Sequence, residues 1–317
     1  MAVQTSPRTP TGSSSTSTAS PRTPTGQPWT EKWGGLLFVA PFLVLFGFFL
    51  LWPTLSGLWN SFFNKSLAGV GGEFLGLANW REVFHDPAVW SSLKNTLVFT
   101  AMSTPPLVLT ALVMALLANR TGVFGWFLRF AYFAPFVLPA TVVTLIWVWI
   151  YQPGFGLVNG LLTSAGFAEI DWLNTENRAM LAVVITTVWW TVGFNFLLYL
   201  AALQGIPEHL YEAAAIDGAG DRQKLFRITL PLLSRTTGLI VVLQLVASLK
   251  IFDQIYLMTV GGPNFSTRPI IQYIYESGFT SYRIGYASAI SYLFFVVIVI
   301  VSIAQFKLFS GRKEDLR

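Results

Sequence analysis

Six long apolar segments constrain the fold of this chain more than any other feature of its sequence. A helix needs about 20 apolar residues to cross the hydrocarbon core of a bilayer. Segments of this kind are expected at about 35–60, 95–118, 130–150, 179–204, 236–260 and 285–306. Charged residues make up 11% of the 317 residues, whereas a soluble domain carries about 25%. The sequence therefore predicts an all-α integral membrane protein with six transmembrane helices.

The first 28 residues differ in composition and precede a predicted membrane domain over 29–317. They are mostly Ser, Thr, Pro and Gly, and the heptad Ser-Pro-Arg-Thr-Pro-Thr-Gly occurs at 6–12 and again at 20–26. Such a segment cannot bury apolar surface, so we expect a disordered tail. It lacks the apolar core of a signal peptide. The repeated heptad can be interpreted as a spacer or as a docking or phosphorylation site.

Three of the predicted spans contain prolines in pairs. The pairs are Pro41 with Pro53, Pro105 with Pro106, and Pro135 with Pro139. Membrane helices tolerate proline where neighbouring groups bond the freed carbonyls. Two interpretations stay open, namely kinks that serve helix packing and bends that shape a cavity.

The distribution of Lys and Arg predicts the orientation, because short cytoplasmic loops carry an excess of these residues. With a cytoplasmic N-terminus, 87 residues lie in cytoplasmic segments and hold 13 Lys and Arg, against 6 in 85 external residues. The cytoplasmic segments in this count are 1–34, 119–129, 205–235 and 307–317, and the external ones are 61–94, 151–178 and 261–283. We therefore expect a multi-pass protein with both termini in the cytoplasm. Because the basic residues follow the membrane, no nucleic acid is expected as a partner.

The predicted cytoplasmic loop over 205–235, between the fourth and fifth spans, begins with signals for a short helix. Pro207 can start a helix, since its missing N–H would be unpaired there. Residues 208–217 are good helix formers. Gly218 can take positive φ and end that helix.

The second half of this loop predicts another short helix. Asp221 is a suitable N-cap for a helix over 222–229, after which Pro231 is expected to turn the chain into the fifth span. The two short helices would meet at a sharp angle on the membrane surface. The small side chains of Ala213–Ala215 would let another protein approach closely.

Four elements of the loop have a spacing that resembles the EAA loop of binding-protein-dependent ABC importer permeases. They are Glu212-Ala213-Ala214, Gly218, Ile228 and Leu230-Pro231. In that family the loop forms a coupling helix that sits in a cleft of the cytoplasmic ATPase. The resemblance assigns this role to Glu212, Ala213, Ala214, Asp217, Gly218, Ile228, Leu230 and Pro231. Asp217 completes the Ala-x-Asp-Gly motif that is typical of the sugar branch. The alternative is an amphipathic helix at the membrane interface.

Three further stretches extend the resemblance to roughly residues 35–310. Residues 76–80 (Gly-Leu-Ala-Asn-Trp) and 94–97 (Lys-Asn-Thr-Leu) are similar to the external loop and the start of the second span in carbohydrate permeases. Residues 252–263 are similar to the end of their fifth span, with Met258-Thr259 in place of the usual Leu-Thr.

The fifth predicted span contains two charged residues, Lys250 and Asp253. A charge at the bilayer centre costs roughly 2.5–3.5 kcal/mol on insertion scales, so such residues usually face a cavity or a partner. Three residues apart on one helix, the two can pair, and they either fix packing or form a polar wall of the substrate route. The candidates for that route are Lys250, Asp253, Gln254, Tyr256 and Asn195, with Trp189 and Trp190 as weaker ones.

Several kinds of chemistry lack their motifs in this chain. No Gly-x4-Gly-Lys-Ser/Thr phosphate loop occurs, so a separate subunit must bind ATP with Mg²⁺ and hydrolyse it. Neither His85 nor His209 has candidate metal ligands near it in the sequence, and no Ser-His-Asp arrangement is visible. The absence of cysteine excludes disulfides and thiol catalysis. We expect no cofactor, no metal and no catalytic residue in this chain.

The resemblance implies the permease subunit of an ABC importer that moves a sugar or related solute across a bacterial or archaeal cytoplasmic membrane by alternating access. The expected partners are a second homologous permease, two cytoplasmic ATPase subunits, an extracytoplasmic solute-binding protein, a sugar substrate and membrane lipid. The alternative is a self-sufficient secondary transporter of a small polar solute. The docking loop, the missing internal repeat and the scarcity of acids in the spans argue against it. A membrane-embedded enzyme is a third interpretation, and it lacks a site.

Overall fold

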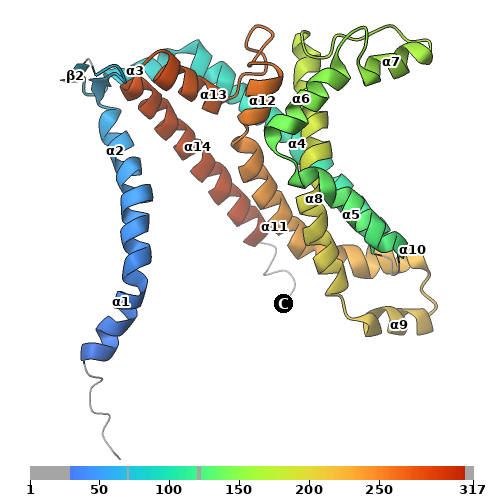
Figure 1. Ribbon diagram of the computed structural model, residues 1–317. Helices are drawn as coiled ribbons and strands as arrows, with labels where there is room; N and C mark the ends of the chain where they lie inside the picture. Colours follow the sequence, from blue (N-terminus) through green and yellow to red (C-terminus); the bar gives the residue numbers. More distant parts are fainter. Residues whose placement is uncertain (1–28, 70, 120–122, 311–317) are drawn as a thin grey trace, which may run out of the picture. The chain divides into compact units, whose positions relative to one another are not determined.

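A computed structural model describes residues 29–69, 71–119 and 123–310 of the chain (Figure 1). The predicted tail over 1–28 lies outside these residues. The chain divides into two units, Met1–Leu55 and Ser56–Arg317. The helices and strands are α1 Trp29–Phe46, α2 Trp52–Asn60, β1 Phe63–Lys65, β2 Gly71–Phe74, α3 Ala78–His85, α4 Pro87–Ala118, α5 Val123–Val137, α6 Ala140–Tyr151, α7 Leu157–Ser164, α8 Glu176–Gln204, α9 Glu208–Ile216, α10 Asp221–Lys224, α11 Leu230–Leu249, α12 Asp253–Met258, α13 Ile270–Tyr275 and α14 Ile284–Ser310, with π-helical segments η1 Gly47–Leu51, η2 Leu225–Thr229 and η3 Glu276–Thr280.

Five helical stretches within the described residues are long and apolar enough to cross a membrane. They are Phe38–Asn60, Pro87–Ala118, Glu176–Gln204, Asp221–Leu249 and Ile284–Gln305. The prediction of long membrane-spanning helices is therefore confirmed for five of the six segments. A bent pair, Phe124–Val137 with Ala140–Tyr151, makes a sixth if it is taken as one span.

The third predicted span, 130–150, is not one straight helix, because α5 and α6 meet at an angle of 98°. The break falls at Leu138 and Pro139. A proline disfavours helical backbone at the residue before it and has no N–H of its own. The carbonyl of Leu138 accepts a hydrogen bond of 3.1 Å from the indole Nε1 of Trp190 on α8. The neighbouring helix thus satisfies a carbonyl at the break, as a bilayer requires.

The fifth predicted span, 236–260, has different bounds in the structure. The helix begins at Asp221 and runs through α10, η2 and α11 to Leu249. The predicted separate helix over 222–229 and the turn at Pro231 are therefore wrong. Asp221 is the first helical residue, and Gly220 takes the N-cap position predicted for it.

Two of the three π-helical segments end two residues before a proline. Segment η1 precedes Pro53, and η2 precedes Pro231. A proline ring collides with the carbonyl four residues earlier in a regular α-helix. A π turn changes the hydrogen-bond register locally and lets the helix continue. At η2 the N–H of Leu230 donates to the carbonyl of Leu225, five residues back.

Helices α4, α5, α8 and α11 of the second unit share one buried cluster around α8. Alanines 111, 115 and 118 of α4 are fully buried there, with Phe196 and Tyr199 of α8. In lipid, helices associate through close packing of small residues, since the tails are as apolar as the side chains. Gly193 provides such a contact, because a Cβ at this position would lie 2.8 Å from the carbonyl oxygen of Tyr132 on α5.

A short antiparallel hairpin, β1 with β2, departs from the all-α prediction. Phe63 pairs with Phe74 and Asn64 with Glu73, and Gly69, Gly71 and Gly72 supply positive φ angles around its turn. Within the second unit, the hairpin, α3, α7, α12 and α13 lie at one end, called the hairpin end (Figure 1). Helix α9 lies at the opposite end, called the α9 end.

Replacing Gly193 by Ala is expected to destabilise the protein by about 1–3 kcal/mol, because the added methyl group meets backbone atoms of α5 that cannot yield easily. The measurement is thermal unfolding of the purified chain in detergent. Gly160→Ala in α7 is the matched control, since no atom lies within 4 Å of its added Cβ. Equal melting temperatures for the two variants would contradict the close α5–α8 packing.

Candidate functional site

The loop between α8 and the helix beginning at Asp221 has the local structure predicted for its first half. Helix α9 begins after Pro207, as expected. Gly218 has a φ of +77°, which reverses the chain at little cost because glycine lacks a Cβ. Backbone bonds from Gly218 to Ala215 (3.0 Å) and from Ala219 to Ala214 (2.8 Å) close the helix end.

The residues that the resemblance assigns to coupling lie on two neighbouring elements. Glu212, Ala213, Asp217 and Gly218 are exposed on α9 and its end, and Ala214 is half-buried. The side chain of Ile216 on the same helix is 88% exposed. The other three coupling residues lie on η2 and at the start of α11, where Ile228 and Leu230 are half-buried and Pro231 is exposed. The exposed apolar side chain of Ile216, beside the small residues of α9, suits contact with another protein.

Lys250 and Asp253 do not lie on one helical face, so the prediction of a paired charge is wrong. Lys250 follows the last residue of α11, and Asp253 is the first residue of α12, after a break at Ile251 and Phe252. Both are exposed, and no ion pair joins these two described side chains. A cation is favoured at a helix C-terminus and an anion at an N-terminus, so each charge complements the helix end that it follows or begins.

Asn195 lies inside the bundle, where it bonds other side chains. Its Nδ2 donates to Oε1 of Gln244 on α11 over 2.8 Å. The Nε2 of Gln244 donates to the hydroxyl of Ser248 (3.0 Å), which accepts from Ser103 on α4 (3.2 Å). All four side chains are buried, so this chain of bonds links α4, α8 and α11.

Gln254 is also buried, and only one of its two amide atoms has a hydrogen-bond partner among the described residues. Its Oε1 lies 3.0 Å from the hydroxyl of Thr187 on α8. Its Nε2 has no partner among the described residues. Gln254 is therefore enclosed by protein and does not face an open substrate route in this structure.

Sequence reasoning named Tyr256 but missed the other aromatic side chains that lie around it, beside Asp253. The ring of Phe252 lies 5.3 Å from Tyr256 and 5.7 Å from Tyr275, and Tyr275 lies 5.5 Å from Phe279. Tyr275 and Phe279 are 38% and 55% exposed. Both the pair 252 and 256 and the pair 275 and 279 are four residues apart, a spacing that puts two rings on one helical face. That spacing was the signal in the sequence.

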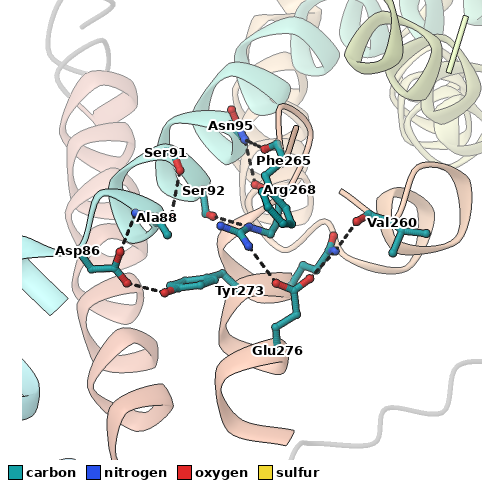
Figure 2. A network of polar contacts seen from close by, with 11 residues as sticks. Asp86, Ala88, Ser91, Ser92, Asn95, Val260, Phe265, Arg268, Tyr273 and Glu276 are labelled. Carbon is teal, nitrogen blue, oxygen red and sulfur yellow. Dashed lines mark hydrogen bonds and ion pairs between the residues drawn. The ribbon is translucent and has the colours of Figure 1, made fainter. Parts of the chain in front are cut away.

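At the hairpin end, Arg268 joins the loop after α12 to α4 and to η3 (Figure 2). Its guanidinium lies 3.1 Å from Oε2 of Glu276 and 3.3 Å from the hydroxyl of Ser92. It also lies over the rings of Phe265 and Tyr273, at 4.1 and 4.6 Å. Arg268 is buried, and a buried charge needs such partners.

Side chains of the stretch over 94–97 hold the same loop by hydrogen bonds to its backbone. The Nδ2 of Asn95 donates to the carbonyls of Phe265 (2.9 Å) and Arg268 (3.1 Å), as Figure 2 shows. The hydroxyl of Thr96 accepts from the N–H of Ile270 (2.9 Å). In the stretch over 76–80, Asn79 similarly donates to the carbonyls of Ser61, in the turn after α2, and of Phe63 in β1.

Asp86 connects the start of α4 to α13 and α14. Its carboxylate caps α4 through the N–H of Ala88 (2.8 Å) and accepts from the hydroxyls of Tyr273 and Tyr286. Burial raises the pKa of the Asp86 carboxyl, but these hydrogen bonds and the Arg268 charge outweigh burial and hold the pKa below its usual value.

Comparison with known proteins gives one consistent result. Residues 108–314 match the family described as "Binding-protein-dependent transport system inner membrane component". The chain is 35% identical to the sulfoquinovosyl glycerol transport system permease protein SmoG of Agrobacterium fabrum, over 84% of this chain and 87% of that protein. It is 34% identical to the sn-glycerol-3-phosphate transport system permease protein UgpA of Salmonella typhimurium, over 87% and 94% of the two chains.

The fold of this chain is similar to that of a chain in the crystal structure of a bacterial alginate ABC transporter. That transporter was crystallised in complex with an alginate pentasaccharide-bound periplasmic protein. The TM-score is 0.75 and the sequence identity 24%, over 87% of this chain and 93% of that one.

The Asp86 network is expected to make stability depend on pH in acid. Because the folded-state pKa lies below the unfolded value of about 3.9, the stabilisation is present above that value and is lost as pH falls through the folded-state pKa. The melting temperature of wild type should therefore exceed that of Asp86→Asn most at pH 7, and the gap should narrow between about pH 5 and 3.

The matched control for this experiment is Asp171→Asn. The Asp171 carboxylate bonds only Asn174 in its own loop among the described contacts, so its removal should change the melting temperature little. A wild-type advantage over Asp86→Asn that stays constant down to pH 3 would exclude the proposed bonding of Asp86.

Proposed function

Since the chain belongs to the family of binding-protein-dependent transport system inner membrane components, we propose that it carries a sugar or a related solute across the cytoplasmic membrane, driven by a separate ATPase. The chain is the permease subunit of an ATP-binding-cassette importer and a transport component, not an enzyme. The exposed α9, with its small residues and its sharp end at Gly218, is the observation that carries the ATPase part of the proposal.

Helix α9 is the surface on which a cytoplasmic ATPase subunit docks. Its alanines permit close approach, and the exposed side chain of Ile216 is an apolar anchor for a cleft. The excess of Lys and Arg in the segments predicted to be cytoplasmic puts this loop on the ATP side. A second homologous permease completes the pore, and each permease holds one ATPase, which binds ATP with Mg²⁺.

The aromatic group beside Asp253 supports a carbohydrate substrate. Sugar rings stack on aromatic faces, and their hydroxyls bond carboxylates and amides. Tyr256, Tyr275 and Phe279 provide the faces, and the exposed carboxylate of Asp253 provides a polar contact. The relatives named above belong to transport systems for sulfoquinovosyl glycerol and sn-glycerol-3-phosphate. Both solutes carry hydroxyl groups, as a sugar does. Lys250 adds a cation to the same break, whereas Asn195 is engaged inside the bundle.

The hairpin end is where an extracytoplasmic solute-binding protein delivers the substrate. The loop between α12 and α13 is held rigid at its base by Asn95 and Arg268, while the side chain of Phe265 is 56% exposed. A preorganised surface binds a partner at lower entropic cost. The related alginate transporter has been crystallised with a periplasmic protein.

Co-purification tests the importer proposal against the secondary-transporter alternative. The tagged chain is isolated in mild detergent, and its partners are identified by mass spectrometry. Recovery of an ATPase and a second permease, with uptake that stops when the ATPase is deleted, supports the importer. Ion-driven uptake by the isolated chain in liposomes, with no need for ATP, would establish the alternative.

Gly218→Lys is expected to reduce uptake by at least about tenfold, while insertion into the membrane stays normal. A side chain at φ +77° costs roughly 1–2 kcal/mol, and the added charge would lie in the ATPase cleft. The measurements are uptake of labelled sugar and retention of the ATPase during purification. Gly160→Lys, at an exposed glycine with ordinary φ and open space far from α9, is the matched control and should retain the ATPase during purification. Normal uptake by Gly218→Lys would refute docking through this turn.

Asp253→Ala is expected to change the substrate concentration for half-maximal uptake or the maximal rate by about tenfold to 150-fold, because a hydrogen bond to a charged group contributes about 1.5–3 kcal/mol. Membrane levels of the protein should stay unchanged, because Asp253 is exposed and has no ion-pair partner among the described residues. Glu169→Ala, an acidic residue in the loop after α7, is the control. A variant that only lowers protein levels would make Asp253 structural.

A further inference from the structure

Among the described residues, one side chain of α9 forms a hydrogen bond outside its own helix. The hydroxyl of Tyr211 lies 2.9 Å from the hydroxyl of Thr229 in η2. Thr229 is buried, and Tyr211 is half-buried. The other α9 side chains are exposed, apart from the half-buried Leu210 and Ala214. This contact is thus the side-chain hydrogen bond that joins α9 to the helix Asp221–Leu249 among the described residues, in addition to the backbone of the loop 217–220.

The direction of this hydrogen bond depends on the neighbouring one. Thr229 has a single hydroxyl proton, which the carbonyl of Lys224 at 3.3 Å can accept. Either hydroxyl can donate in the pair of Tyr211 and Thr229, and Tyr211 is the donor whenever the Thr229 proton bonds the carbonyl of Lys224. The accepting carbonyl is five residues earlier, which is the π register of this segment, so the contact is tied to the π turn itself.

Two further hydrogen bonds join this helix to α8. Thr237 accepts from Tyr199 (3.0 Å) and Gln244 accepts from Asn195 (2.8 Å), both on α8. Thr237 and Gln244 are seven residues apart, about two turns of an α-helix, and therefore lie on one face. Thr229 precedes Thr237 by eight residues, and the helix between them is a regular α-helix. Thr229 is therefore rotated about 80° from the face that bonds α8, and its hydroxyl contacts α9 instead.

The three bonds lie at successive levels of the helix Asp221–Leu249, from the end beside α9 toward the break at Lys250. Each joins the α8–α9 segment to the helix Asp221–Leu249, and Ser248 extends the series to Ser103 on α4. A set of packed and hydrogen-bonded contacts of this kind carries coupling between distant sites when it has two arrangements. A π turn is a place where a helix can shift its register, so it is suited to change arrangement.

We propose that the hydrogen bond between Tyr211 and Thr229 transmits the displacement of α9 to the helix Asp221–Leu249, and through its π turn to the break before α12. Tyr211 is then a positioning residue for transport: it contacts neither substrate nor ATP, and it faces away from the surface that docks the ATPase. This inference rests on the proposed function, since α9 moves only if an ATPase moves it.

The test uses the complete importer, purified with its ATPases and second permease and reconstituted in liposomes with the solute-binding protein. Tyr211→Phe and Thr229→Val each remove one hydroxyl with little change of shape. Thr229→Ser keeps the hydroxyl. Tyr132→Phe is the matched control. Tyr132 packs against the buried cluster shared by α4, α5, α8 and α11, and no hydrogen bond of its hydroxyl is among the described contacts. The readouts are ATPase content, ATP hydrolysis rate, and solute moved per ATP.

We expect Tyr211→Phe and Thr229→Val each to lower solute moved per ATP by about threefold to tenfold, the range for one hydrogen bond. ATPase content and ATP hydrolysis should stay within about twofold of wild type, as should all readouts for Thr229→Ser and Tyr132→Phe. The double variant should resemble either single variant, because both remove the same bond.

Three outcomes would overturn the inference and leave the proposed function standing. The first is an unchanged ratio of solute to ATP in Tyr211→Phe. The second is loss of the ATPase from that variant, which would make Tyr211 a docking residue. The third is additive loss in the double variant. If wild type itself retains no ATPase, the proposed function fails, and the inference fails with it.

Discussion

Every backbone N–H and C=O inside a bilayer needs a partner from the protein, because hydrocarbon offers none. The irregular features of this chain follow from that requirement. At Pro139 the helix breaks, and Trp190 of α8 bonds the carbonyl of Leu138. At Pro53 and Pro231 the helix continues, because a π turn just before each proline alters the register. The same residue type therefore gives a 98° bend in one place and a continuous helix in another.

Polar side chains meet the same requirement between helices. Asn195, Gln244, Ser248 and Ser103 bond one another in a buried series rather than facing an open route. Such bonds fix the rotation and register of α4, α8 and α11, since a slip would leave amides unpaired in an apolar surrounding. Lys250 and Asp253 lie at helix ends, where the termini stabilise them.

The sequence predicted the apolar spans well, because each is a long run of one kind of residue. It also predicted α9 and its end at Gly218, since the propensity of 208–217 and the glycine agree. It could not predict the break at Pro139 while Pro105 and Pro106 remain inside α4, because the outcome depends on Trp190, which is distant in sequence. The turn expected at Pro231 failed for a related reason, since a π turn has no simple local signature. The hairpin had a signal in its glycines, and the aromatic group had one in its spacing of four.

The break between Leu249 and Asp253 links these constraints to transport. Membrane proteins tolerate non-helical backbone at membrane depth where it is buried in protein or lines a water-filled cavity. Here Gln254 and Ile255 are buried on one side, while Lys250 and Asp253 are exposed on the other. A lipid contact would disfavour two exposed charges, so the exposed side is better suited to a cavity or to the second permease. A helix end, two charges and the aromatic group therefore meet at the break. The helix that ends there, Asp221–Leu249, begins beside α9, and the buried hydrogen bonds of Gln244 and Ser248 join its last turns to α8 and α4.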